Sequence, residues 1–122
     1  MNILNISFVG YISFQLLPEF YSISSVFIHD SRDEPWGVSV QEALMSGLPV
    51  IVSDRVGAGY DLVKAEENGY VYTSGDVDDL VVKMQKTLLL RKSNILIVND
   101  EVLKDWTYES IINGLRSITP AC

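Results

Sequence analysis

The stretch VFIHDSRDEPWGVSVQEALMSGLPVIVSD, residues 26–54, decides the fold. Two short apolar runs, residues 26–29 and 49–53, flank a helical pattern over residues 38–46 that stops at Gly47. Each run is nearly continuous in apolar residues rather than alternating, which is typical of strands buried on both faces of a parallel sheet. A strand, a helix and a second such strand predict a βαβ unit.

The same alternation continues on both sides of this unit. Further strands are expected at residues 3–9 and, after the turn pair Asn68-Gly69, at residues 70–73. Residues 95–103 are ambiguous between strand and helix, and we favour a helix. Other helices are expected around residues 16–23 with Pro18 in the first turn, at 59–65, at 77–88 with Asp76 as N-cap, and after Thr107 as N-cap. The sequence therefore predicts an α/β fold: a Rossmann-like parallel sheet of about four strands with flanking helices.

Composition and charge exclude several classes of protein. The chain has 122 residues, enough for one domain over residues 1–122, and its 48% hydrophobic content argues against disorder. Its net charge of −7 excludes a nucleic-acid binder that works through a basic face. We expect no transmembrane segment, because no apolar run approaches the roughly 20 residues that span a bilayer. The sole cysteine is Cys122, so we expect a reducing, cytoplasmic setting and no cysteine-based metal site.

The loop between the first strand and the helix of the βαβ unit carries the most unusual chemistry. The N-terminus of a helix presents free N–H groups and a partial positive charge, and is therefore a natural anion site. Gly37 lets a phosphate approach the backbone closely, because it has no Cβ. Glu34 precedes this helix and Glu42 lies on it. Carboxylates accept hydrogen bonds from sugar hydroxyls, so two of them beside an anion site suggest a phosphate that carries sugars on both sides.

Glu34 and Glu42, with seven residues between them, closely resemble the E-x7-E signature of retaining glycosyltransferases with the GT-B fold, family 4 in particular. The resemblance covers nearly the whole chain and implies its C-terminal, donor-binding domain. Further segments resemble family motifs in the family's order. FVG (8–10) resembles the F-x-G motif, residues 20–26 resemble the step from helix to strand, and VGAGYDLV (56–63) resembles the GG-x-x-E-x-V turn. GLPVI (47–51) and NGYVY (68–72) also match family segments, and Trp106-Thr107 resembles the start of the family's last helix.

The resemblance implies a role for each matching residue. Glu34 is similar to the glutamate that touches the donor sugar near the reacting carbon, and is the catalytic candidate. Glu42 is similar to the glutamate that holds the nucleotide ribose. The backbone around Gly37, Val38 and Ser39 would take the diphosphate, Trp36 would wall the site, and Gly10 and Tyr11 would contact the base. The family uses no metal, so no cofactor is expected beyond the nucleotide-diphosphate sugar itself.

The chain also departs from the family pattern. The family's donor domain opens with two further strands, whose loops carry an Arg and a Lys that neutralise the diphosphate, and neither the strands nor the acceptor-binding domain is expected here. The available cations are Arg32, Arg55 and Lys64, none at the family's basic positions. In the usual strand order 3-2-1-4-5-6, the strand at residues 3–9 would lack its neighbour. We therefore expect a homo-oligomer or a separate acceptor-binding chain, and a location at the membrane surface if that partner or the acceptor lies there.

Two functions of different classes remain open. The first is the donor-binding half of a retaining glycosyltransferase that transfers a sugar from a nucleotide-diphosphate sugar to a glycan or lipid-linked acceptor, inactive as this chain alone. The second is a non-catalytic α/β module that oligomerises without binding nucleotide sugar, which the net charge favours. A phospho-acceptor pocket around Asp30, Asp33 and Glu34 would need a lysine after a later strand, and residues 73–75 offer none. His29 is read as structural.

Overall fold

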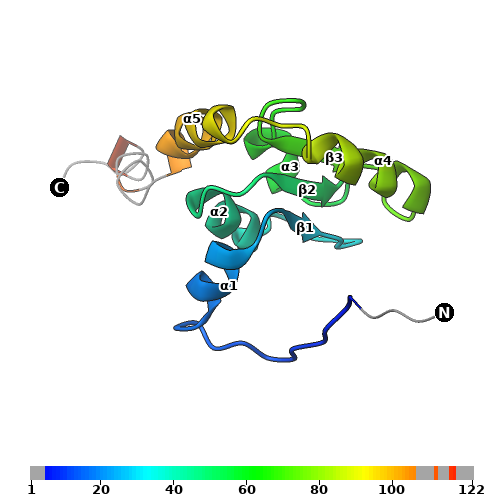
Figure 1. The fold of residues 1–122 in the computed structure, drawn as a ribbon. Helices are drawn as coiled ribbons and strands as arrows, with labels where there is room; N and C mark the ends of the chain where they lie inside the picture. Colours follow the sequence, from blue (N-terminus) through cyan, green and yellow to red (C-terminus); the bar gives the residue numbers. More distant parts are fainter. Residues whose placement is uncertain (1–4, 107–111, 113–115, 118–122) are drawn as a thin grey trace.

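The computed structural model describes residues 5–106, 112 and 116–117 (Figure 1). Three strands form one parallel sheet in the order β1-β2-β3: β1 (Phe27–His29), β2 (Val50–Ser53) and β3 (Gly69–Tyr72). The helices precede, connect and follow them: α1 (Leu17–Ile23), α2 (Val38–Met45), α3 (Ala58–Leu62), α4 (Val77–Thr87), α5 (Lys92–Leu103) and the 3₁₀ helix η1 (Lys104–Trp106). The α/β fold with a parallel sheet is confirmed.

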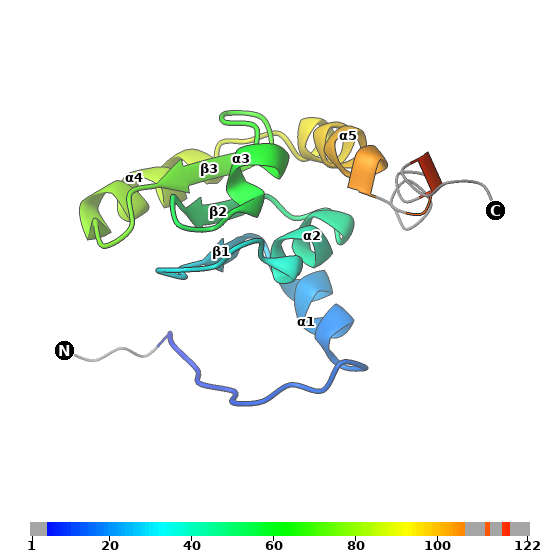
Figure 2. The same ribbon diagram turned by 180° about the vertical axis from the view of Figure 1, so that it is seen from behind.

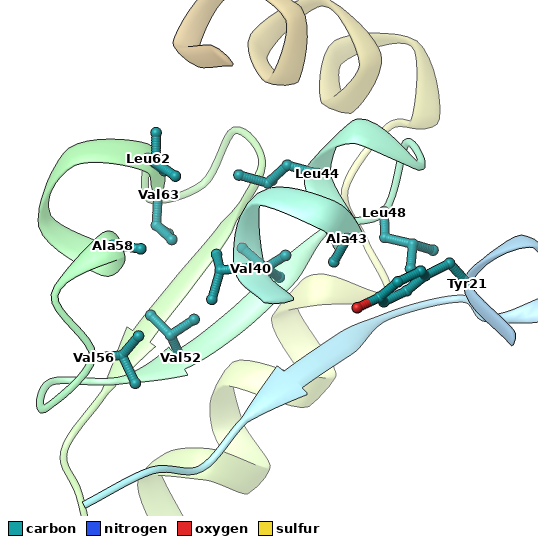
Figure 3. Packing of buried hydrophobic residues seen from close by; sticks show 11 residues of the cluster. Tyr21, Val40, Ala43, Leu44, Leu48, Val52, Val56, Ala58, Leu62 and Val63 are labelled. Carbon is teal, nitrogen blue, oxygen red and sulfur yellow. The ribbon is translucent and has the colours of Figure 1, made fainter. Parts of the chain in front are cut away.

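The central strand β2 is covered by helices on both faces of the sheet. Val50 and Val52 belong to the hydrophobic cluster that α2 and α3 build over one face of the sheet, as Figure 3 shows for Val52. Side chains alternate along a strand, so the fully buried Ile51 faces the other side. There α4 packs against β2 and β3, and its ribbon passes behind the sheet in Figure 3. The connecting helices α2 and α3 therefore share one face, as right-handed crossovers predict, and α4 covers the other.

The strand predicted at residues 3–9 is wrong where the structure describes it. Residues 6–12 belong to no helix or strand, Gly10 among them has a φ of +69°, and residues 5–12 have no hydrogen bond to another described residue. They run well away from the sheet in the two opposite views of Figures 1 and 2. A strand needs a neighbour to satisfy its backbone groups, and nothing in the described part of the chain supplies one. The sheet consequently has three strands rather than about four.

The other expected elements are found close to their predicted bounds. The ambiguous segment 95–103 lies within α5, so the helix was the right choice, and Pro18 lies in the first turn of α1. The carboxylate of Asp76 accepts the N–H of Asp79 at 3.0 Å and caps α4 as predicted. The helix expected at 59–65 is α3, which ends at Leu62. The helix after Thr107 lies outside the described residues.

A buried amide network fixes α5 to the layer that carries α2. Asn99 of α5 donates both N–H groups, to the carbonyl oxygens of Leu44 and Leu48, each at 3.1 Å. Its own oxygen accepts from the side chain of Asn68 at 3.2 Å, and Asn68 also donates to the carbonyl of Leu62 at 3.0 Å. Each amide reaches backbone groups at the end of a different helix. The network therefore holds the C-terminal ends of α2 and α3 against α5.

Candidate functional site

The loop at the carboxyl end of β1 is held by backbone bonds to the loop that follows β2. The N–H of Glu34 donates to the carbonyl of Arg55 at 3.1 Å, and the N–H of Gly57 donates to the carbonyl of Glu34 at 2.9 Å. A Cβ at Gly57 would stand 1.9 Å from the carbonyl oxygen of Pro35, so the close approach of the two loops requires glycine there. These contacts fix Glu34 at the edge of the sheet where ligands of open α/β folds bind.

The side chain of Glu34 is half-buried and turns back on its own loop. Its Oε1 accepts the N–H of Trp36 at 3.3 Å, which is a long and weak hydrogen bond. A carboxylate has two oxygens with about four acceptor positions. Glu34 therefore retains capacity to accept hydrogen bonds from ligand hydroxyls while the loop keeps it in place.

The N-terminus of α2 has no side-chain cap. Gly37 is the N-cap residue, with a φ of +102° in the left-handed region and no side chain to cap the helix. Val38 and Ser39 open the helix, so their N–H groups have no partner within it. A Cβ at Gly37 would point inward and meet a Val56 methyl carbon at 3.0 Å. Gly37 thus provides both the uncapped start predicted for an anion site and the tight packing beneath it.

Trp36 packs against the C-terminal side of the fold. Its indole N–H donates to Oε1 of Gln41 at 2.7 Å, and its ring lies against that of Trp106 at a centroid distance of 4.5 Å. Its carbonyl accepts the N–H of Ala58 at 2.8 Å. The structure accordingly gives Trp36 a packing role between α2 and η1, while its predicted contact with a donor stays a prediction.

Glu42 is bound by a tyrosine that the sequence analysis did not single out. The buried Tyr21 of α1 donates its hydroxyl to Oε2 of Glu42 at 3.0 Å (Figure 3 shows the ring facing α2). Burial raises the pKa of Tyr21 to about 12, and the nearby carboxylate of Glu42 adds to the effect. The signal was in the sequence: a tyrosine on the apolar face of a helix needs a partner for its hydroxyl.

A cavity of about 340 Å³ opens beside this pair. Its walls are mostly apolar, and its lining residues come from α1, from the segment before α1 and from α2: Phe14, Leu17, Pro18, Tyr21, Glu42, Met45 and Ser46. The carboxylate of Glu42 is its one charged group. A flat, largely apolar ligand group with hydroxyls at one end would match this combination.

Gly10 and Tyr11 are not brought to the other candidates. Both lie in the irregular segment before α1 rather than at a strand end, and Tyr11 is almost fully exposed. Neither forms a hydrogen bond with another described residue. Their contact with a nucleotide base stays a prediction that this arrangement does not by itself support.

Two of the three candidate cations, Arg32 and Arg55, meet in a separate hollow at the carboxyl edge of the sheet, whereas Lys64 lines a different cavity. Arg32 and Arg55 line a cavity of about 470 Å³ together with Asp54 and residues 73–75. Nearby, the hydroxyl of Tyr72 donates to Asp30, and burial raises the pKa of Tyr72 to about 12, with Asp30 adding to the effect. Asp54 in the wall lowers the positive charge that the two arginines offer. Among the described residues, no group of three or more His, Cys, Asp and Glu is placed to hold a metal ion.

Comparison with known proteins identifies the family of the chain. Residues 2–99 match the family model described as glycosyl transferases group 1. The chain belongs to this glycosyltransferase family. It is 32% identical to sulfoquinovosyl transferase SQD2 of Arabidopsis thaliana over 93 residues, which are 74% of this chain and 18% of SQD2. It is 34% identical to the GDP-mannose-dependent alpha-mannosyltransferase of Mycobacterium tuberculosis over 118 residues, 86% of this chain and 30% of that protein.

Solved structures show the same fold. Sucrose-phosphate synthase of Thermosynechococcus elongatus superposes with a TM-score of 0.76 at 26% identity, over 92% of this chain and 29% of that one. The Anabaena protein HepE, solved in complex with UDP and glucose, superposes with a TM-score of 0.69 at 22% identity, over 92% and 32%. The chain therefore has a fold of the GT-B glycosyltransferase type. It spans 18–30% of the length of the curated relatives it matches. No helix in the described ranges is long and apolar enough to cross a bilayer.

Proposed function

We propose that this chain is the donor-binding part, C-terminal in position, of a retaining family 4 glycosyltransferase, and that it binds a nucleotide-diphosphate sugar. The observation that carries the proposal is the open N-terminus of α2 at the carboxyl end of β1, with Glu34 before it and Glu42 on it. The names of the relatives support the ligand class: one is GDP-mannose-dependent, and HepE was solved with UDP and glucose.

The described residues suit distinct parts of such a donor. The uncapped N–H groups of Val38 and Ser39, with the backbone of Gly37, face where the diphosphate would lie, and the helix dipole favours its negative charge. Glu34 would bind the sugar hydroxyls near the reacting carbon, since its carboxylate has acceptor positions left. Glu42 would bind the ribose through Oε1, because Oε2 is occupied by Tyr21.

The chemistry that follows is electrostatic. As the bond between sugar and diphosphate breaks, negative charge grows on the departing diphosphate, and preorganised N–H groups at the start of α2 stabilise it. No metal is part of this proposal. Transfer to a glycan or lipid-linked acceptor requires an acceptor-binding region, on a separate chain or in a longer protein, so we expect no transfer by this chain alone.

A nucleotide titration tests the proposal. UDP, GDP, ADP and their sugar conjugates are titrated into the chain while tryptophan fluorescence and backbone amide shifts are recorded. We expect saturable binding of one nucleotide, with amide shifts at Val38 and Ser39. Glu42→Gln keeps an acceptor for Tyr21 and removes the charge, so affinity should fall about ten-fold or more, the value of a charged over a neutral hydrogen bond.

Glu101→Gln is the matched control, because it makes the same change on the exposed surface of α5. Its affinity should equal that of the unmodified chain. If no nucleotide binds up to millimolar concentration, the donor-site proposal fails for this chain and the non-catalytic module takes its place. If Glu42→Gln binds the nucleotide as tightly as Glu101→Gln does, Glu42 makes no contact with the nucleotide and its assignment to the ribose fails.

A further inference from the structure

The position of the Glu42 side chain depends on a neighbouring hydroxyl. Tyr21 donates to Oε2 of Glu42 at 3.0 Å. Among the described residues, no other side chain bonds to this carboxylate, and no lysine or arginine lies within salt-bridge distance of it. A glutamate side chain is flexible and loses rotamer freedom when it is fixed. In the described part of the chain, the bond from Tyr21 is therefore what restricts the carboxylate.

Tyr21 is itself firmly held. It is the buried residue of α1, and its ring belongs to the same hydrophobic cluster as Ala43 and Leu48 (Figure 3). The ring also packs against that of Phe27 in β1, at a centroid distance of 5.9 Å. Because burial raises the pKa of Tyr21 to about 12, the hydroxyl keeps its proton near neutral pH. Tyr21 is thus a fixed donor on a rigid side chain.

The backbone of Glu42 is fixed as well. Its carbonyl accepts the N–H of Ser46 at 3.1 Å and the hydroxyl of Ser46 at 2.9 Å, at the C-terminal end of α2. Glu42, Tyr21 and Ser46 all line the cavity that was assigned to the nucleoside. In a largely apolar cavity, a hydrogen bond to a charged group is stronger than in water. Glu42 is therefore held at both its backbone and its Oε2, while Oε1 stays available.

We infer that Tyr21 is a positioning residue: it holds the Glu42 carboxylate ready for a ribose hydroxyl and thereby makes the site prefer ribonucleotides to deoxyribonucleotides. The inference rests on the proposed donor site. A ligand binds more tightly when its partner side chain is already fixed, because the entropy of fixing that side chain has been lost beforehand. For one flexible side chain this effect is worth about two- to ten-fold in affinity.

Ribose selectivity tests the inference. UDP, GDP and ADP, with their 2′-deoxy and 3′-deoxy counterparts, are titrated by calorimetry into the unmodified chain and into Tyr21→Phe, which keeps the ring and removes the hydroxyl. For the nucleotide that binds, the unmodified chain should prefer the ribose form to at least one deoxy form by about ten-fold or more, the value of one hydrogen bond to a charged group.

Tyr21→Phe should reduce that preference. Its affinity for the ribose form should be about two- to ten-fold lower, because the carboxylate is no longer held. The deoxy form against which the unmodified chain discriminates lacks the contact with Glu42, so its affinity should change less than about two-fold. The ratio of the two affinities separates positioning from a general loosening of the cavity, which would weaken both forms alike.

Tyr72→Phe is the matched control. Tyr72 is also a buried tyrosine that donates to a carboxylate, that of Asp30, and neither residue lines the cavity beside Glu42. Its ribose preference should equal that of the unmodified chain. Circular dichroism and the urea midpoint show that both variants are folded at the temperature of the titration.

The possible results distinguish this inference from the donor-site proposal. Equal weakening of both forms in Tyr21→Phe would overturn the inference, because Tyr21 would then support only the fold. A larger ribose preference in Tyr21→Phe would also overturn it, because the hydroxyl would then compete with the ribose for the carboxylate. In both cases a nucleotide still binds, so the donor-site proposal stands. If no nucleotide binds the unmodified chain, both are wrong.

Discussion

Replacing Gly37 by alanine should reveal how tightly the start of α2 is packed. The residue has a φ of +102°, where a side chain costs about 1–2 kcal/mol. In addition, the new Cβ would lie 3.0 Å from a methyl carbon of Val56, 3.3 Å from one of Val40 and 3.4 Å from Cδ2 of His29. Overpacking of this kind costs typically 1–3 kcal/mol. We expect a total loss of about 2–4 kcal/mol in the free energy of unfolding, after a small gain from the stiffer unfolded chain.

Gly75→Ala separates the two contributions. Gly75 has a φ of +84°, similar in sign to that of Gly37, but a Cβ there would meet nothing within 4 Å. The two variants share the backbone strain and the change in the unfolded chain. The difference between them is therefore the crowding against Val56 and its neighbours, about 1–3 kcal/mol.

Urea denaturation followed by circular dichroism measures both variants. Gly37→Ala should lower the midpoint without changing the slope, because the surface exposed on unfolding stays the same. If the two variants lose the same free energy within about 0.5 kcal/mol, the site around Gly37 relaxes freely. The reasoning that the packing beneath the anion site is tight would then be refuted.

Three further predictions concern the described contacts. Asn99→Ala leaves buried carbonyls without a donor and should cost about 2–4 kcal/mol, whereas Asn94→Ala on the exposed side of α5 should cost none, both measured by urea denaturation. Asp76→Ala removes the cap of α4 and should lower the free energy of unfolding by about 1 kcal/mol. Tyr21 and Tyr72 have pKa values raised from 10.0 to about 12, so the folded state holds their protons more tightly than the unfolded state. Stability from this source is complete below pH 10 and is lost as the pH rises from 10 to 12; the urea midpoint should fall over that range, and less steeply in a variant with both tyrosines changed to phenylalanine.

The sequence predicted those elements whose pattern is local. Residues 49–52 are all apolar, and β2 (Val50–Ser53) is fully buried. Asp76 caps α4 because a cap depends only on the next few residues. The prediction of a strand at residues 3–9 failed because pairing is not a local property. Its β-branched and aromatic residues suit a strand, but a strand also needs a neighbour, and a neighbour is not a property of the segment.

In the candidate site, too, the local features could be predicted and the contacts between distant residues could not. The spacing of Glu34 and Glu42 and the glycine at the start of α2 could be read directly. The bond from Tyr21 to Glu42 and the pairing of Asn68 with Asn99 join residues 21 and 31 positions apart, respectively. Nothing in the local sequence selects such partners among the other polar residues. They become visible only when the helices are placed.

Different parts of the fold hold the two ends of the proposed donor site in place. Glu34 and the start of α2 are fixed by backbone bonds to the loop after β2 and by the core beneath Gly37. The cavity beside Glu42 is walled instead by α1, whose one buried residue is Tyr21, and by Phe14 from the segment that precedes it. The diphosphate end of the site therefore depends on the core of the sheet, and the nucleoside end depends on how α1 and Phe14 are held against α2.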